Sequence, residues 1–207
     1  MRYDFREKAV EASLKVLAFA ALAVLAGIVF YLFREGLPVF AQTGLLDFVF
    51  GTDWYPVGDN PDFEIGSLIA GSLAVTFLAS LIAVPLGLMT AAYLSEVAAD
   101  TTRRVIKPFI ELLAALPSVV IGFIGMVLVA PWLQNTLGIA TGLNLFNAAL
   151  MLAFMAVPTI CSIAEDALHA VPRSLKDASL ALGATPWETL KNVTFPYALS
   201  GVGTAVM

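Results

Sequence analysis

This sequence has unusually few charged residues. Only 13% of its 207 residues are Asp, Glu, Lys or Arg, and 59% are hydrophobic. Soluble globular domains carry about 25% charged and 45–50% apolar residues. So few charges cannot cover a water-facing surface, which excludes an ordinary soluble domain. The sequence therefore predicts an integral membrane protein, most of whose surface faces lipid or other apolar helices.

Side chains that carry chemistry are equally scarce. Cys161 is the single cysteine and His169 the single histidine. An internal disulfide and a cysteine-rich metal site are excluded, no metal site is predicted, and Cys161 is expected to be a small core residue. One histidine also argues against a membrane enzyme, which needs convergent His, Asp or Glu. A net charge of −5 without a basic run argues against nucleic-acid binding.

Stretches without charge locate the membrane spans, since a helix needs about 17–25 apolar residues to cross a bilayer. The predicted spans are 16–33, about 67–94, about 112–133 and 145–164. The first is too long for the apolar region of a signal peptide and lacks a small-x-small cleavage site, so we expect it to stay uncleaved. The chain turns apolar again from Phe195 to Met207. These residues are interpreted as part of a fifth span that is cut short.

Lysine and arginine gather in alternate connections, and this bias sets the orientation of a membrane protein. Arg34 is the one basic residue of the first loop between spans, which also carries the acids Asp47, Asp53, Asp59, Asp62 and Glu64. The other ten basic residues are Arg2, Arg6, Lys8, Lys15, Arg103, Arg104, Lys107, Arg173, Lys176 and Lys191. The N-terminus is therefore predicted to be cytoplasmic.

The loop after the fourth span contains sequence signals for the start and the end of helices. Ser174 with Asp177 three residues later predicts an N-cap, a short helix over 175–182 follows, and Gly183 is a permissive stop. Thr185, Pro186 and Glu188 then form a T-x-x-E capping box with proline at the first helical position. We expect two short helices that meet at an angle around Gly183. Pro196 ends or kinks the second helix where the membrane begins again.

The same loop carries a family resemblance. Asp177-Ala178-Ser179, three residues, Gly183, nine residues and then Val193-Thr194-Phe195-Pro196 resemble the EAA loop of ABC importer permeases, E-A-A-x3-G-x9-I-x-L-P. Every spacing agrees, with conservative departures at Asp177, Ser179, Val193 and Phe195. The competing interpretation is an amphipathic helix pair that lies in the headgroups and only joins two spans. The resemblance implies a coupling helix that contacts a cytoplasmic ATPase through Asp177, Ala178, Ser179, Gly183, Thr185, Pro186, Val193 and Pro196.

The resemblance extends along nearly the whole chain and is greatest to PstC-type permeases of phosphate importers. The segments that carry it are 50–56 (FGTDWYP), 66–73 (GSLIAGSL), 83–88 (AVPLGL), 93–96 (YLSE) and 107–120 (KPFIELLAALPSVV). It implies an all-α, polytopic, type I importer permease (MetI-like) fold with about five of six helices present. The implied division is an N-terminal part, 1–64, and a permease core, 65–207, with its coupling loop at 165–196.

The resemblance also implies an assembly in the bacterial inner membrane. The implied partners are a PstA-type permease, a dimer of PstB-type ATPases that binds ATP and Mg, a periplasmic phosphate-binding protein and membrane lipid. This chain itself has no G-x-x-x-x-G-K-[ST] loop and is expected to be neither an enzyme nor a cofactor-binding protein. The alternatives are a permease for another oxyanion or small solute, and the PstA-type sister. A secondary transporter is disfavoured because spans two to four lack buried ionisable residues.

Because spans two to four contain no Lys, Arg or His, they can offer a phosphate anion only neutral groups. Thr76, Pro117 and Ser118 are the candidate lining or gating residues; the competing interpretation is that Pro and Ser are simply common in membrane helices. Near the inner face, Glu111 is expected to be solvated or to pair with Lys107. Glu165, Asp166 and His169 are expected to be solvated or in contact with a partner. Trp54, Tyr55 and Pro56 are expected to anchor the outer loop at the interface or to seat the binding protein.

Overall fold

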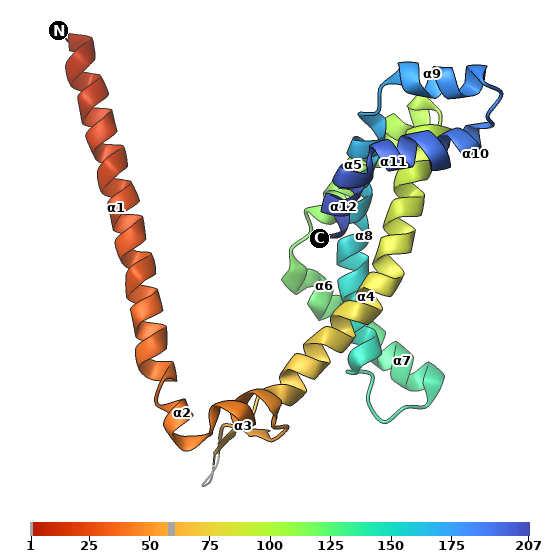
Figure 1. The fold of residues 1–207 in the computed structure, drawn as a ribbon. Coiled ribbons are helices and arrows are strands. Elements are labelled where there is room, and N and C mark those ends of the chain that lie inside the picture. Colours follow the sequence, from red (N-terminus) through yellow and green to blue (C-terminus); the bar gives the residue numbers. More distant parts are fainter. Residues whose placement is uncertain (1, 58–60) are drawn as a thin grey trace. The chain divides into compact units, whose positions relative to one another are not determined.

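The computed structural model describes residues 2–57 and 61–207, without the side chains of 2–6, 9 and 42. Asp59 and the side chains of Arg2 and Arg6 therefore lie outside the described residues. The chain divides into two compact units, up to Ala70 and from Gly71 onwards. Four helices are long and apolar enough to cross a membrane: Val10–Ala41, Gly66–Val97, Ser118–Leu137 and Leu145–His169. The predicted all-α polytopic architecture is confirmed (Figure 1).

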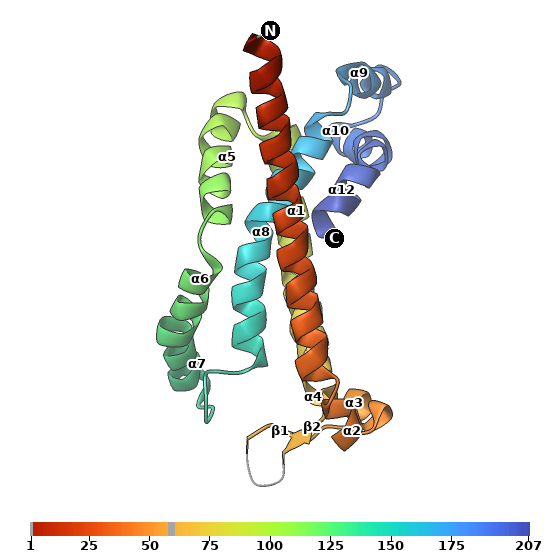
Figure 2. The same cartoon turned by 90° about the vertical axis from the view of Figure 1, so that its left-hand side faces the viewer.

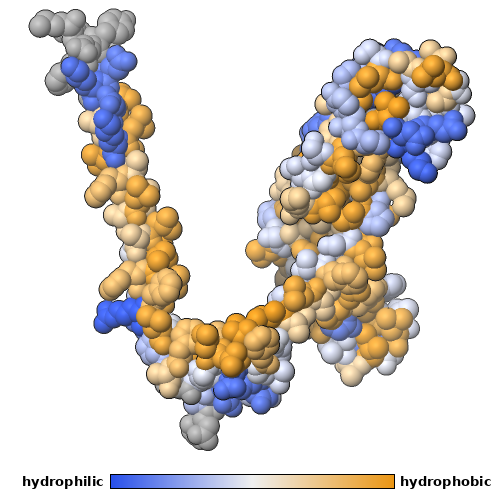
Figure 3. Space-filling model, viewed as in Figure 1, coloured by the Kyte–Doolittle hydropathy of each residue, from blue (hydrophilic) through white to orange (hydrophobic). Residues whose placement is uncertain are grey.

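The first unit is one long helix followed by a folded loop. Its elements are α1 (Arg2–Gly36), α2 (Val39–Gln42), α3 (Leu45–Phe50), β1 (Trp54–Tyr55) and β2 (Asp62–Phe63). The middle of α1 is covered by hydrophobic side chains (Figure 3). The strands pair antiparallel, with Trp54 opposite Phe63 and the two rings edge-on at 6.4 Å. The Gly66 amide donates to the carbonyl of Gly51 (2.9 Å), which closes the loop at the start of the next helix.

The second span is α4 (Gly66–Ala92), extended by a π-helical turn, η1 (Tyr93–Val97). Pro85 lies inside α4 without ending it, as expected for one helix over about 67–94. Small residues at every fourth position, Ala79, Ala83, Gly87 and Ala91, form its buried face. A Cβ at Gly87 would lie 2.7 Å from a methyl of Ile160. This stripe of small residues therefore allows α4 to approach the fourth span closely.

The third span begins later than predicted. The expected span over about 112–133 is wrong at its start, because 112–114 close a separate helix, α5 (Asp100–Ala114), and the span begins at Ser118. Pro117 explains the break: its ring disfavours helical geometry at Leu116, and its own ψ of 128° is extended. The span then continues as α6 (Ser118–Ile124), the π-helical turn η2 (Gly125–Val129) and α7 (Ala130–Leu137). It ends at Gly138, whose φ of 63° is left-handed.

The fourth span, α8 (Leu145–His169), is the centre of the second unit. Asn144 caps it by accepting a hydrogen bond from the Asn147 amide at 3.0 Å. The helix runs five residues beyond the predicted end at Ala164, and α5 and α12 (Leu199–Val206) pack against it. Figure 2 shows α5, α6 and α7 following one another along one side of α8. Cys161 is buried in this core, as expected.

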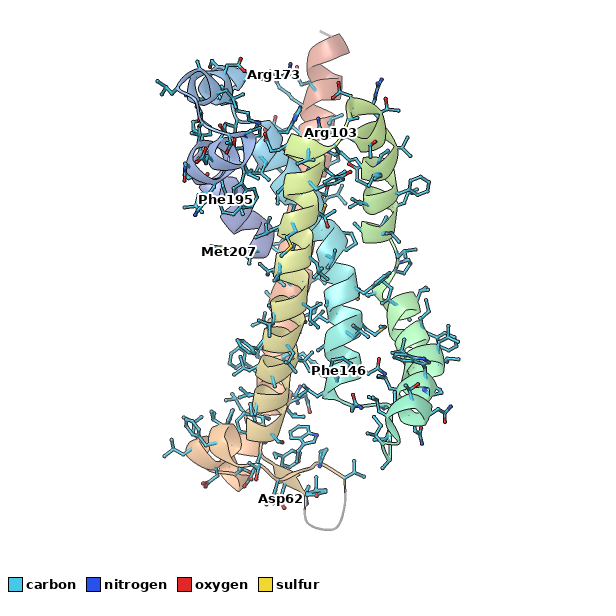
Figure 4. The ribbon with its side chains drawn as sticks, turned by 90° about the vertical axis from the view of Figure 1, so that its right-hand side faces the viewer. Asp62, Arg103, Phe146, Arg173, Phe195 and Met207 are labelled. Carbon is cyan, nitrogen blue, oxygen red and sulfur yellow. The ribbon has the colours of Figure 1, made fainter. Side chains whose placement is uncertain are left out.

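The segment between α8 and α12 forms one end of the second unit (Figure 1). It consists of α9 (Arg173–Ala181), α10 (Pro186–Thr189), the π-helical turn η3 (Leu190–Thr194) and α11 (Phe195–Tyr197). Arg103 on α5 and Arg173 on α9 lie toward this same end, and Phe146 lies toward the other (Figure 4). The basic residues of these two connections therefore share one end of the unit.

Candidate functional site

The first helix of the candidate coupling loop, α9, begins at Arg173, directly after Pro172. The predicted N-cap at Ser174 is wrong, because Ser174 already lies inside the helix and no side chain caps it. Pro172 takes the cap position instead: its ψ of 131° is the extended geometry that an N-cap needs. Asp177 consequently sits in the second turn of α9, not in the first.

Gly183 stops α9 as expected. Its φ of 90° is left-handed, and a Cβ at this position would meet nothing within 4 Å. The Gly183 amide donates to the carbonyl of Leu180 (2.9 Å) and the Ala184 amide to that of Ser179 (3.3 Å). This is the Schellman pairing, which satisfies helix-end carbonyls and requires a residue that tolerates positive φ. Glycine therefore sets the angle between α9 and α10.

The second helix starts with the predicted capping box. Thr185 Oγ1 accepts from the Glu188 amide at 3.3 Å, and Glu188 Oε2 accepts from both the amide and the hydroxyl of Thr185 at 2.8 Å. These hydrogen bonds from Thr185, the amide first, lower the pKa of the Glu188 carboxyl. Pro186 occupies the first turn, where a missing N–H costs nothing.

We expect Thr185→Ala to cost about 1 kcal/mol of local helix stability, because the substitution removes the N-cap acceptor. Hydrogen exchange at the amides of α10 measures this as faster opening, and Thr185→Ser is the matched control that keeps the hydroxyl. The lowered pKa of Glu188 gives the pH dependence: its contribution is present above its ordinary pKa of 4.5 and is lost as pH falls below that value. Equal protection in Thr185→Ala and wild type would contradict the box.

The loop has an outer and an inner face. Asp177, Ala178, Pro186 and Pro196 are exposed, whereas Ser179 and Val193 are partly buried. The Ser179 and Thr189 hydroxyls are hydrogen-bonded at 2.9 Å, which ties α9 to α10. The eight predicted coupling residues thus do not share one face: some point to solvent and Ser179 holds the two helices together. Leu182 and Trp187, which the family pattern does not specify, are 90% and 70% exposed at the corner between the helices.

A buried ion-pair network lies where α5 meets the end of α8. Glu165 is 1% exposed, with Arg103 Nη2 at 2.5 Å from Oε1 and Lys107 Nζ at 2.7 Å from Oε2. Lys107 also pairs with Asp166, and Arg103 Nη1 lies 3.0 Å from His169 Nε2. Burial alone would lower the pKa of Lys107, but hydrogen bonds to Asp166 and Glu165 outweigh it and raise that pKa.

One expectation about these charges is wrong. Glu165 is not solvated, because α8 continues past 164 and carries its carboxylate into the contact with α5. Of the two alternatives for Glu111, the structure has the exposed side chain, because Lys107 pairs across to Glu165 and Asp166. Arg103 and Lys107 are four residues apart, so they share the face of α5 that packs on α8. His169 is likewise tied to Arg103.

The candidate pathway residues line two adjoining pockets. Thr76 lines a pocket with Ser80 and Thr159 where α4, α8 and α12 meet. Ser118 lines another pocket, with Asn147, between the third span and α8. Leu152 and Met155 line both pockets, and the pocket of Thr76 holds more hydroxyls. Pro117 precedes α6 as its N-cap residue.

Asn147 was missed by sequence reasoning. It is 4% exposed, and its Nδ2 donates to the carbonyls of Gly125 and Gly142, both at 3.0 Å. It thereby joins the π-helical turn of the third span, the following loop and the start of the fourth span. One signal in the sequence could have indicated this role: Asn147 is an amide side chain within a span that carries no charge. A buried amide in such a place needs hydrogen-bond partners.

Known proteins with similar sequences are permeases. "Probable ABC transporter permease protein YqgH" of Bacillus subtilis is 38% identical over 192 residues, which are 92% of this chain and 62% of that protein. "Phosphate transport system permease protein PstC" of Mesorhizobium japonicum is 31% identical over 227 residues, covering 100% of this chain and 68% of its own length. The PstC of Pasteurella multocida is 34% identical over 179 residues, 77% of this chain and 55% of its own.

A solved structure and a family model agree with these relatives. The inward-facing MetNI methionine ABC transporter matches 69% of this chain, and 64% of its own, with a TM-score of 0.51 and 25% sequence identity. The model of the binding-protein-dependent transport system inner membrane component matches residues 83–207. The polytopic helical fold and the inner-membrane location predicted from the sequence are confirmed. This chain belongs to the family of binding-protein-dependent transport system inner membrane components.

Proposed function

We propose that this chain is the transmembrane permease subunit of an ATP-driven importer of inorganic phosphate. In this proposal it forms half of the translocation pathway, with 65–207 as the permease core and 165–196 as the coupling loop that contacts a partner ATPase. The observation that carries the proposal is the corner α9–Gly183–α10. It presents Asp177 and Ala178 to solvent at the end of the unit where the basic loops gather.

The chemistry of this corner suits a protein partner. Leu182 and Trp187 are largely exposed next to a glycine-set bend. Clustered apolar side chains on a polar loop mark interaction sites, and tryptophan is enriched among residues that dominate binding energy. Ala178 allows close approach beside them. A helix pair that lies among the lipid headgroups would bury the same side chains in lipid. Loss of ATPase binding after a substitution at this corner therefore distinguishes the two interpretations.

The proposed mechanism is alternating access driven from outside this chain. Closure of the ATPases, which bind ATP and Mg, moves the docked corner as a rigid body. Because α9 follows α8 after only three residues, 170–172, that motion passes to the fourth span and to α12. Binding energy on the ATPase thus biases a permease with two discrete arrangements.

Phosphate as the solute is supported by the names of the PstC relatives and by the string 107–120. In the structure this string spans the break between α5 and α6 at Pro117. The assembly partners proposed with it are a PstA-type permease, a PstB-type ATPase dimer and a periplasmic phosphate-binding protein. Uptake of radiolabelled phosphate, competed by sulfate, molybdate or arsenate, separates phosphate from other oxyanions.

The docking proposal is tested by Gly183→Asp in the full complex. Both the strained φ and the added charge disturb the corner, so we expect retention of the ATPase to fall roughly tenfold or more, since 1.4 kcal/mol of interface is a factor of ten. Co-purification and phosphate uptake are measured together. Gly138→Asp is the matched control: Gly138 also has positive φ and open space around it, but it lies between the third and fourth spans. If Gly183→Asp retains both ATPase and uptake, the proposal is wrong.

A further inference from the structure

An ion pair joins the inner face of α9 to the end of the second span. Lys176 Nζ lies 2.5 Å from Glu96 Oε1, across 80 residues of sequence. The two side chains are only 17% and 18% exposed. The Ser95 hydroxyl donates to the same Glu96 oxygen at 3.1 Å and so orients the carboxylate. Neither the family pattern of the loop nor the predicted site includes this pair.

The pair lies on the inner side of α9, away from the residues that are proposed to contact the ATPase. Lys176 is the inward neighbour of Asp177, which is exposed together with Ala178 on the outer face of α9. Glu96 belongs to η1, which continues α4 without interruption. Through Lys176 and Glu96, α9 is therefore joined to the helix that carries Thr76 and Ser80.

We propose that Lys176 and Glu96 are positioning residues that transmit the motion of the docked helix to the second span. This inference rests on the proposed function, because it takes α9 to be the helix that the ATPase moves. It adds a route: the chain connection carries motion to α8 and α12, and the ion pair carries it to α4.

The ion pair joins α9 to a span that its other contacts do not reach. The connection 170–172 joins α9 to α8, and the Ser179–Thr189 hydrogen bond joins it to α10. Within residues 71–207, all of which the structure describes, Lys176–Glu96 is the one ion pair between α9 and a membrane span. Without it, no ion pair couples α9 to the second span.

Burial distinguishes this pair from an ordinary surface ion pair. Exposed pairs contribute little, since water screens both charges. The pair Glu11–Lys15 on α1 is of that kind: its nitrogen–oxygen distance is a similar 2.6 Å, but its side chains are 61% and 74% exposed. Lys176 and Glu96 are more than four-fifths shielded, so their attraction is screened less. Glu11–Lys15 therefore serves as the matched control for charge reversal.

The test uses the full complex in proteoliposomes, with solute imported per ATP hydrolysed as the readout. Glu96→Lys and Lys176→Glu each place like charges together, so we expect each to lower this ratio about fivefold or more, the lower end of coupling effects between sites. The ATPase should remain bound in both. The double reversal Glu96→Lys/Lys176→Glu restores the attraction and is expected to return the ratio to near wild type. Glu11→Lys should leave it unchanged.

Several results would overturn the link between Lys176 and Glu96. The wild-type complex must first import solute. If both single reversals then leave the amount of solute imported per ATP hydrolysed unchanged, the link is overturned and the docking proposal stands. A double reversal that folds but does not recover overturns the link as well. If a single reversal does not fold, the neutral pair Glu96→Gln/Lys176→Gln replaces it, and a ratio equal to wild type overturns the link. Failure of the wild-type complex to retain the ATPase, or full ATPase retention and uptake in Gly183→Asp, overturns the proposed function on which the link rests, and both results are obtained before the charge reversals are made.

Discussion

Replacing Arg103 and Lys107 together by glutamine is expected to lower the free energy of unfolding by about 3–5 kcal/mol, the cost of leaving a buried charge without its partner. Glu165 is 1% exposed and contacts both cations. Either single substitution leaves one cation in place and should cost much less. The double substitution leaves the carboxylate in the contact between α5 and α8 with no positive charge on it.

The measurement is thermal unfolding of the purified permease complex. Arg104→Gln is the matched control on the same helix, because the Arg104 side chain donates to the backbone carbonyl of Asp100 and does not reach Glu165. The triple variant that adds Glu165→Gln removes the stranded charge and should recover most of the loss. A double variant as stable as Arg104→Gln would show that the network does not hold α5 on α8.

The spans could be read from the sequence because lipid permits few charges. Long runs without Asp, Glu, Lys or Arg are therefore position markers in themselves. The turn at Gly183 and the capping box at Thr185 were equally legible, since both depend on residues within one or two helical turns. Local chemistry of this kind needs no knowledge of the rest of the fold.

What could not be predicted depends on distant partners. The sequence predicts that Glu165 follows a span, and solvation is the ordinary state of such an acid. Its two cations come from 58 and 62 residues earlier in the chain. The Lys176–Glu96 pair spans 80 residues. Charge patterning within one helix suggested Lys107 with Glu111, but tertiary packing gave Lys107 stronger acceptors on α8.

The π-helical turns η1, η2 and η3 were also beyond sequence reasoning. Such a turn arises when one extra residue is accommodated in a helix. At η2 the Gly125 carbonyl accepts the π-helical hydrogen bond from the Ala130 amide and a second one from Asn147 Nδ2. Asn147 Nδ2 also holds the Gly142 carbonyl, so the loop before the fourth span depends on one buried side chain.

Gly142→Ala is expected to prevent the third and fourth spans from closing against each other. Gly142 is buried, and a Cβ there would overlap the carbonyl group of Ala130 and lie 2.6 Å from its Cα. A rigid backbone cannot turn aside as a flexible side chain can, so the loop must move and the hydrogen bond from Asn147 is lost. We expect a destabilisation of about 4 kcal/mol or more, at the upper end for single substitutions.

The matched control is Gly122→Ala in the third span, where an added Cβ meets nothing within 4 Å. Alanine favours the helix there by up to about 1 kcal/mol, so this variant should be neutral or slightly more stable. Both are compared by thermal unfolding and by the amount of folded protein extracted from the membrane. Because Asn147 acts on the same loop, Asn147→Leu should weaken the same contact, and adding it to Gly142→Ala should cost less than the sum of the two effects. A Gly142→Ala protein as stable as the Gly122→Ala control would mean that the loop can shift freely, and that Asn147 does not fix the register of the two spans.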